Sequence, residues 1–419
     1  MYLCNLNNWL TSPKIGGIRR QLPKSRKFYG MRFVLGVALL LTAASVGAQT
    51  VDCTHNVWQS LEACGWPGPT NTGPDLTQCP GGTLTNNSGS TTRTITISTP
   101  GTVMSCQNIT GGLQITAQNV TVKNSIISYD GGGAGGSGVI NINDGGSATV
   151  DHVELNGLDH THACIWDEGV KGSTLQYSMA AKNVNCHDVN DGIFSWWWSR
   201  DKNAGAGSDF IIQDSYFHDF TENAANGHID GYQTEGATNG TITHNTYKIL
   251  RTPNDVTVSG AGLDSAIAIW DDYNQSTPTG LTAGHFVISN NLMGGQPGFM
   301  AYAEDYSGPN GQATENVANS AVGGNSLSDV KFVNNYWSNY YASCVGIYGT
   351  WFYRGAWTPY YGGPTDLWNQ SGSLRSGNIV LETGENIDTG GPTGCEGHNT
   401  SPPPPTSVAA PAAPKAAPR

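Results

Sequence analysis

A seven-residue pattern of apolar and polar positions recurs six times along the chain. The second and seventh residues of each copy are apolar, and β-branched residues are frequent between them. Short runs of this kind, bounded by glycine, asparagine and aspartate, are typical of β-strands. Chance aligns two such segments easily, but hardly six. The copies are 121–127, 149–155, 211–217, 241–247, 287–293 and 331–337.

The pattern predicts an all-β fold in which the copies lie on one another as successive rungs. Apolar positions that recur once per coil, without helical segments between them, describe a single parallel β-helix, which we expect over residues 81–399. The fifth position is asparagine in three successive copies, Asn245, Asn291 and Asn335, which predicts a ladder of stacked amides. An antiparallel sandwich or propeller is the alternative, but no turn signal here separates two paired strands.

Two N-terminal segments read as targeting sequence. Residues 31–48 resemble a secretory signal peptide, with a short apolar run followed by Val46-Gly47-Ala48. Residues 1–30 are basic and form either a leader or a mis-annotated start. The apolar run is too short to cross a bilayer. We therefore expect a secreted or cell-surface protein without a membrane span after signal cleavage.

The two ends of the remaining chain differ from the repeats. Val57, Leu61 and Cys64 fall at helical spacing and predict one short helix in an N-terminal cap over residues 49–80. Residues 400–419 are rich in proline and alanine, which predicts a disordered tail.

Charge narrows the range of partners. Cleavage after Ala48 removes seven of the 20 basic residues and none of the 32 acidic ones, which leaves 13 against 32 and a formal charge of −19. Such a surface repels nucleic acid and anionic lipid, so we expect neither as a partner. Polyanionic polymers would need bridging cations. The length of 419 residues would allow two or three domains, but a repeat can form one long domain.

Eight cysteines remain after signal cleavage, and an even number in an exported chain favours disulfides. Zinc is the weaker alternative, because no Cys-x-x-Cys pair occurs. Proximity and repeat position favour four pairs, although spacing alone does not fix them: Cys53–Cys64, Cys79–Cys106, Cys164–Cys186 and Cys344–Cys395.

A second set of strands carries the candidate chemistry. We align these strands on a small residue that each of them contains: Ala163, Gly192, Gly231, Ala266 and Gly298. The residues just before these positions then form one column: His162, Asp191, Asp230, Ser265 and Pro297. His228 lies beside Asp230. Adjacent rungs lie about 4.8 Å apart. Two carboxylates at that spacing shift each other's protonation, which leaves one as acid and one as anion, as glycoside cleavage requires. We therefore take His162, Asp191, His228 and Asp230 as candidate catalytic residues.

These residues also have simpler interpretations. An Asp-Gly at a coil corner is often only a turn, and Asp159-His-Thr-His162 could be a polar loop. The acidic residues at the ends of the same strands form either a solvated rim or a cation site, for which Asp271 and Asp272 are the metal candidates. Calcium is the one possible cofactor.

Aromatic residues gather at the same edge. Indole and phenol rings stack on sugar rings, and three consecutive tryptophans are hard to bury together, so sugar stacking competes here with core packing. The candidate substrate-binding residues are Trp166, Trp196, Trp197, Trp198, Glu235, Trp270 and Tyr302.

Several of these motifs together resemble the secreted bacterial right-handed parallel β-helix repeat proteins of the pectate-lyase-like superfamily. The resemblance covers residues 67 to about 390 and rests on motifs such as His228-Ile-Asp-Gly-Tyr-Gln233 and Asn290-Asn-Leu-Met-Gly-Gly295. It implies a right-handed coil. The tryptophan-isoleucine-aspartate-histidine signature of pectate lyases is absent, as are the Gly-His-Gly and Arg-Ile-Lys motifs of polygalacturonases.

Three functions follow as hypotheses. The first is cleavage of an extracellular polysaccharide by acid–base glycoside hydrolysis, acting as a monomer, which predicts that Asp230→Asn abolishes turnover. The second is a calcium-dependent polysaccharide lyase. The third is a non-catalytic glycan-binding or surface protein that uses Trp196–Trp198 as a platform.

Overall fold

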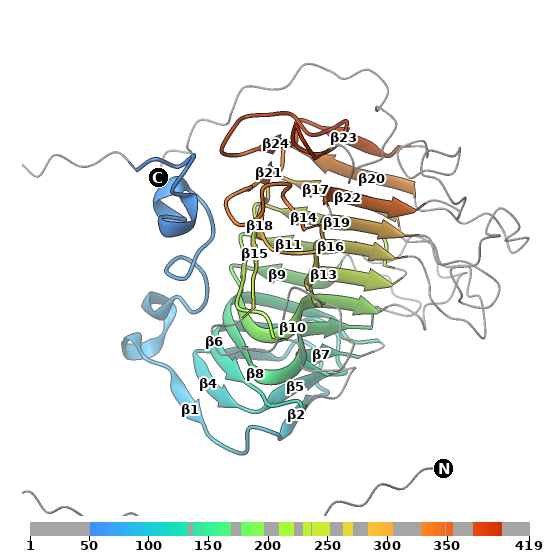
Figure 1. Cartoon of the computed structure of the whole chain (residues 1–419). Coiled ribbons are helices and arrows are strands. Elements are labelled where there is room, and N and C mark those ends of the chain that lie inside the picture. The colour runs from blue at the N-terminus through green and yellow to red at the C-terminus, as the bar shows by residue number, and fades with distance from the viewer. Residues whose placement is uncertain are drawn as a thin grey trace, which may run out of the picture. The chain divides into compact units, whose positions relative to one another are not determined.

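Parallel strands stacked one above another make up most of the molecule (Figure 1). The computed structural model describes residues 51–132, 137–143, 145–168, 177–196, 209–221, 229–235, 237–251, 263–270, 284–304, 328–347, 349–354 and 372–395. Within these ranges every pairing between two strands is parallel, as a parallel β-helix requires. The predicted leader (1–30), signal peptide (31–48) and tail (400–419) lie outside them.

The pairings divide the strands into three stacks, which we call faces A, B and C. The chain visits them in the order A, B, C, and from β11 onward each strand pairs with the strand three positions later. Face A contains β3 (Val103–Ser105), the starts of β6 (Val120–Ser128) and β8 (Ala148–Asp167), β9 (Tyr177–Lys182), β11 (Asp209–Gln213), β14 (Gly240–Thr243), β17 (Gly284–Ser289), β20 (Ser328–Val333) and β23 (Leu374–Ser376).

The other two faces continue the same coils. Face B contains β1 (Thr85–Asn87), β4 (Gln107–Thr110), parts of β6 and β8, the start of β10 (Asn185–Trp196), β12 (Tyr216–Phe217), β15 (Thr246–Ile249), β18 (Leu292–Gly295), β21 (Tyr336–Trp337) and β24 (Ile379–Val380). Face C contains β2 (Thr94–Ile97), β5 (Gly112–Ile115), β7 (Gly138–Ile142), the ends of β8 and β10, β13 (Ile229–Glu235), β16 (Leu263–Trp270), β19 (Phe299–Glu304) and β22 (Gly349–Arg354).

The six predicted copies are in the predicted register. Thr121 pairs with Thr149, Thr241 with Val287, and Val287 with Lys331. The second positions of the copies therefore stack into one buried column, and the seventh positions form another. Removing such side chains from water stabilises the coil by about 1.5–3 kcal/mol each. The columns are Val122, Val150, Ile212, Ile242, Ile288 and Phe332, and Ile127, Leu155, Phe217, Tyr247, Met293 and Trp337.

The turn between faces A and B has the same backbone form on successive rungs. The residue at this corner adopts a positive φ, for example 54° at His244 and 56° at Asn334. Asparagine and aspartate tolerate this left-handed region better than other side chains do, which explains why they dominate the position. The corner residues are Asn124, His152, Asn183, Asp214, His244, Asn290 and Asn334.

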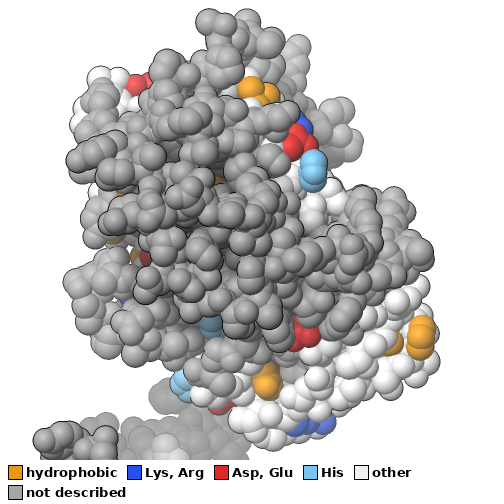
Figure 2. All heavy atoms as spheres, turned by 90° about the vertical axis from the view of Figure 1, so that its right-hand side faces the viewer, with side chains coloured by type: hydrophobic (Ala, Val, Ile, Leu, Met, Phe, Trp, Pro, Cys, Tyr) orange, Lys and Arg blue, Asp and Glu red, His pale blue; other side chains and the backbone are white. Residues whose placement is uncertain are grey.

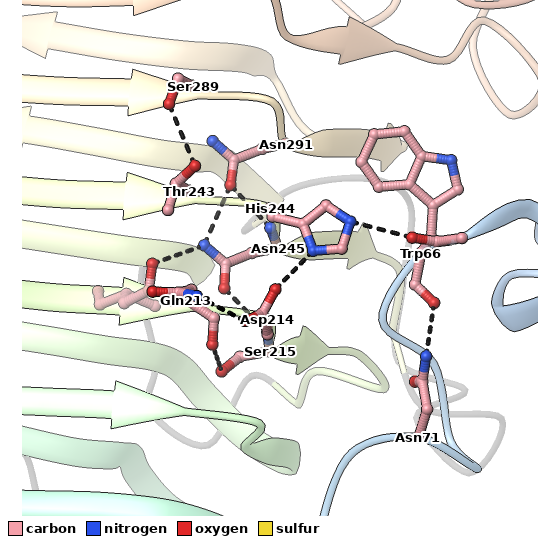
Figure 3. A network of polar contacts seen from close by, with 12 residues as sticks. Trp66, Asn71, Gln213, Asp214, Ser215, Thr243, His244, Asn245, Ser289 and Asn291 are labelled. Carbon is pink, nitrogen blue, oxygen red and sulfur yellow. Dashed lines mark hydrogen bonds and ion pairs between the residues drawn. The ribbon is translucent and has the colours of Figure 1, made fainter. Parts of the chain in front are cut away.

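The predicted amide ladder is present directly after this turn (Figure 3). The side-chain nitrogen of Asn245 donates to the side-chain oxygen of Asn291 at 3.0 Å, and Asn291 donates to Asn335 at the same distance. Asn335 donates in turn to Asn378, which donates to the carboxylate of Asp388. A buried carboxylate, which only accepts hydrogen bonds, thus ends a row of amides that both donate and accept.

The N-terminal segment lies along face B rather than only over one end of the coil. The predicted single helix is instead two 3₁₀-helices, η1 (Val57–Gln59) and η2 (Glu62–Cys64), and the segment continues through η3 (Leu76–Gln78) and η4 (Pro80–Gly82). The helix is interrupted because Ser60 closes η1 with an i→i+3 bond to Val57. Trp58 donates to Ser338 at 2.8 Å, and Gly73 donates to Asn183 at 2.9 Å, so the segment contacts rungs far apart along the stack.

All four predicted disulfides are confirmed: Cys53–Cys64, Cys79–Cys106, Cys164–Cys186 and Cys344–Cys395. Four disulfides indicate that the chain folds in an oxidising compartment, which is typical of exported proteins. Within the described ranges no helix is long and apolar enough to cross a membrane.

Candidate functional site

The candidate site lies where the chain enters face C, on four successive rungs formed by β8, β10, β13 and β16. Asp230 pairs with Ser265, and the register of β10 with β13 places Asp191 one rung before Asp230. The column Asp191, Asp230 and Ser265 therefore forms as the sequence predicts. A row of short polar side chains at one strand position brings together residues that are more than thirty positions apart in the chain.

The predicted register fails at both ends of this column. Asp191 pairs with Ala163, not with His162, and Ala301 pairs with Ile267, so Gly298 does not lie opposite Ala266. The pairing of β10 with β8 is irregular just before Asp191: His187 pairs with Asn156, but Val189 pairs with Thr161. An irregularity of this kind moves every later residue relative to the neighbouring rung.

His162 and Asp191 nevertheless meet. Nε2 of His162 lies 3.0 Å from Oδ2 of Asp191, although the contact is not straight enough to be an ideal hydrogen bond. Catalytic pairs are often imperfectly aligned when no substrate is bound. The His162 side chain is 19% exposed and that of Asp191 only 1%. The imidazole therefore reaches the surface, whereas the carboxylate beneath it does not.

The remaining oxygen of Asp191 is held from two sides. Oδ1 accepts hydrogen bonds from the backbone nitrogen of Asp230 at 2.9 Å and from the side-chain nitrogen of Asn190 at 3.2 Å. On the next rung, Oδ1 of Asp230 accepts from the hydroxyl of Ser265. Asp230 and Ser265 are fully buried. This network fixes the orientation of the Asp191 carboxylate against His162.

Aromatic side chains enclose the imidazole. The ring of His162 meets Trp166 edge-on at 5.3 Å and Phe194 at 5.8 Å, and these two rings lie 4.4 Å from each other. Trp166 and Phe194 are each 4% exposed and, with Ala163, form a small cluster outside the main core. Aromatic surroundings lower the local dielectric and strengthen the attraction between imidazole and carboxylate.

The other candidate residues fall into two groups. His228, Trp197, Trp198, Asp271 and Asp272 lie outside the described residues. At the ends of the face C strands, the backbones of Trp196, Glu235, Trp270 and Glu304 pair in succession and form one column.

Tyr302 belongs to a different column of face C. It pairs with Ala268 in the same column as Trp166 but four rungs away, or about 19 Å at the usual strand spacing. Tyr302 and Trp166 therefore cannot hold the same sugar unit. The described residues contain no group of three or more histidine, cysteine, aspartate or glutamate side chains placed to hold a metal ion.

A second set of histidine–carboxylate pairs, at the end of the face B strands, was not predicted. Nδ1 of His187 lies 2.8 Å from Asp188, Nδ1 of His218 lies 2.7 Å from Asp219, and the two rings stack at 5.2 Å. Burial favours a neutral His187, but the hydrogen bonds of Asp188 and Glu154 outweigh it and raise the pKa of His187 to about 9. The signal available in the sequence was the dipeptide His-Asp on two consecutive rungs.

Further pairs lie on the outside of the coil, and Figure 2 shows histidine beside acidic side chains on one side of the molecule. His244 lies between Asp214, at 2.6 Å from Nδ1, and the carbonyl oxygen of Gly65, at 2.9 Å from Nε2 (Figure 3). The hydrogen bond with Asp214 raises the pKa of His244. These pairs fasten rungs and the N-terminal segment together. The pair of His162 and Asp191 stands at the start of face C, two residues after the more exposed His160, which lies 3.4 Å from Asp130.

Comparisons with known proteins add no relative: no family model matches the chain, and no curated protein sequence matches it significantly.

Proposed function

We propose that the protein is an exported right-handed parallel β-helix that cleaves an extracellular polysaccharide by acid–base hydrolysis of its glycosidic bonds. The parallel stacking of successive strands supports the coil, and a connection between parallel strands is right-handed in about 98% of cases. The four disulfides support export. A single chain contains the whole candidate site, so we propose that it acts as a monomer.

The contact of His162 with Asp191 carries the proposal. An imidazole that reaches the surface and rests on a buried carboxylate is the usual arrangement of a general acid or base, because the carboxylate orients the ring and stabilises its charged form. General acid–base catalysis contributes about 10²–10⁴-fold to a rate. In this proposal His162 contacts the substrate, while Asp191 and Asp230 hold it in place.

The test is a screen of the mature chain against neutral, mixed and uronate polysaccharides. Release of reducing ends without an ultraviolet-absorbing product supports hydrolysis, and substitution His162→Gln should reduce that release by about 10²-fold or more. His285→Gln is the control, because His285 forms a histidine–aspartate pair with Asp329 on face A, at 2.8 Å, that is more exposed than the pair of His162 and Asp191. Equal rates for wild type and His162→Gln would remove His162 from the mechanism.

The same screen separates hydrolysis from elimination. A calcium-dependent lyase would give an unsaturated, ultraviolet-absorbing product that disappears with a chelator. We place this reaction second, because a uronate needs a cation for its carboxylate, and the described residues contain no group of three or more acidic, histidine or cysteine side chains placed to hold one.

One observation favours a third function. Asp191 and Asp230 are 1% and 0% exposed, so neither carboxylate reaches a polysaccharide directly. A non-catalytic glycan-binding protein would have this property, with its carboxylates serving the fold. In that case saccharides bind in calorimetry, no product forms from any glycan, and His162→Gln changes affinity only.

A further inference from the structure

We infer that the chain binds neutral glycans at a second place, on three aromatic side chains outside face B that we call the outer aromatic set: Trp58, Tyr340 and Tyr341. The inference takes its class of ligand from the proposed function, but it concerns binding and not cleavage. Tyr340 and Tyr341 follow β21, which is five rungs beyond β8, the strand of His162, or about 24 Å at the usual strand spacing. A sugar unit on Tyr340 therefore cannot also contact His162.

The rings of the set reach the surface, yet contacts hold them in place. Tyr340 is 50% exposed, and Trp58 and Tyr341 are half-buried. The ring of Tyr341 meets Tyr340 edge-on at 4.9 Å and lies 5.4 Å from the ring of Trp58. Nε1 of Trp58 donates to the hydroxyl of Ser338 at 2.8 Å, and the side-chain nitrogen of Gln59 donates to the hydroxyl of Tyr340 at 3.0 Å. Large rings that are already ordered bind a ligand with little further loss of conformational entropy.

The coil is shaped to receive the first of these rings. A side chain at Gly294 of β18 would come within 2.3 Å of the ring of Trp58, so the glycine lets that ring lie against the strand. Trp58 and its partner Ser338 are 280 residues apart in the chain. Apolar side chains scattered singly on a surface need no explanation, whereas an exposed cluster that the fold brings together marks a binding surface.

The polar groups beside the set suit the hydroxyls of a glycan. One face of a sugar ring presents C–H groups, which stack on the face of an aromatic ring. Its hydroxyls pair with amides, which both donate and accept hydrogen bonds. Gln59 and Gln296 supply exposed amides at the edge of the set: Gln59 contacts Tyr340, and Gln296 donates to the carbonyl oxygen of Tyr341 at 3.4 Å.

The charges beside the set favour a neutral glycan over an anionic one. Glu382 accepts from the backbone nitrogen of Asn339 at 2.9 Å. Burial, Tyr340 and the negative charge of Asp219 raise the pKa of Tyr341 to about 12, so Asp219 also lies close to the set. A cation is present on the neighbouring strand β15, at Lys248, but Asp219 offsets its charge. Carboxylates in this position repel a polyuronate.

The experiment measures retention of the mature chain on insoluble cellulose, chitin and xylan, and its migration in gels that contain a soluble neutral β-glucan or polygalacturonate. We expect at least one neutral glycan to bind more tightly than polygalacturonate does. Tyr340→Ala should weaken that binding about 5–10-fold, because the main exposed stacking surface is lost. Tyr340→Phe keeps the ring and should weaken it less than about threefold. Leu374→Ala is the control, because Leu374 is 39% exposed on face A, and it should bind like wild type.

Three results would overturn the inference: no neutral glycan binds, polygalacturonate alone binds, or Tyr340→Ala binds like wild type. Self-association that sedimentation detects in wild type but not in Tyr340→Ala, without glycan binding, would assign the set to a second copy of the chain and also overturn it. Failure of the proposed function is a different result: no glycan is cleaved, while a neutral glycan still binds and Tyr340→Ala still weakens it. Circular dichroism checks that each variant is folded.

Discussion

Substitution of Asn291 by alanine tests how much the amide ladder stabilises the coil. The Asn291 side chain is fully buried and makes four hydrogen bonds: it accepts from the backbone and side-chain nitrogens of Asn245 and donates to the carbonyl of Ile242 and to Asn335, all at 3.0 Å. Alanine removes all four and leaves the backbone N–H of Asn245 without an acceptor.

The magnitude follows from these bonds. An orphaned buried N–H costs about 1–3 kcal/mol, and each of the other three lost bonds costs about 1 kcal/mol. These costs sum to about 4–6 kcal/mol. Because hydrogen bonds in one network are not additive, we expect Asn291→Ala to lower the free energy of unfolding by about 3–5 kcal/mol. The amide nitrogen of Asn245 should also lose its protection from hydrogen exchange.

The assay is guanidinium-induced unfolding followed by tryptophan fluorescence, with the disulfides intact. Asn108→Ala is the matched control: Asn108 is exposed on β4 and makes a single side-chain bond, to Asn86 at 3.3 Å, so its loss should cost at most about 0.5 kcal/mol. A change below about 1 kcal/mol for Asn291→Ala would refute the view that the ladder is a main source of stability.

Two further predictions concern charge and covalent links. The pKa of His187 is raised from 6.5 to about 9, so its interaction with Asp188 and Glu154 stabilises the fold below pH 6.5 and is lost as the pH rises through about 9. Asp188→Asn should therefore lower the pKa of His187 in an NMR titration and cost about 1–3 kcal/mol near pH 6, but little above pH 9. Replacing Cys164 and Cys186 together by alanine should lower stability by about 2–4 kcal/mol in thermal unfolding, and an unchanged Tm would contradict this.

The sequence predicted those rungs whose second position is a large apolar residue. The rung at Ala180 lies between the second and third predicted copies but was missed, because its second position is Ala181, which is too small to stand out. The last rung was missed for a different reason: Arg375 occupies the second position there, buried and 5.2 Å over the ring of Trp351. The sequence alone does not predict that an arginine is buried at a core position; its contact with an aromatic ring has to be known first.

The sequence pattern aligned Asp191, Asp230 and Ser265 correctly, but it did not give the pairing partners at the two ends of their column. Asp191, Asp230 and Ser265 line up because the register of β10, β13 and β16 is regular from Asp230 onward; the shift in the pairing of β13 with β16 comes before it, after Ile229. His162 meets Asp191 although the strand partner of Asp191 is the next residue, Ala163. The burial of both carboxylates depends on packing between rungs, which the sequence pattern does not report.

The N-terminal segment gives the chain an unusual order of assembly. It is synthesised before the coil, yet its hydrogen bonds join Trp58 to Ser338 and Gly65 to His244, residues that leave the ribosome much later. A rung that contacts only the neighbouring rungs can fold as soon as the previous rung has folded. The N-terminal segment therefore completes its contacts with the coil only after the rung that carries Ser338, one of the last, has formed.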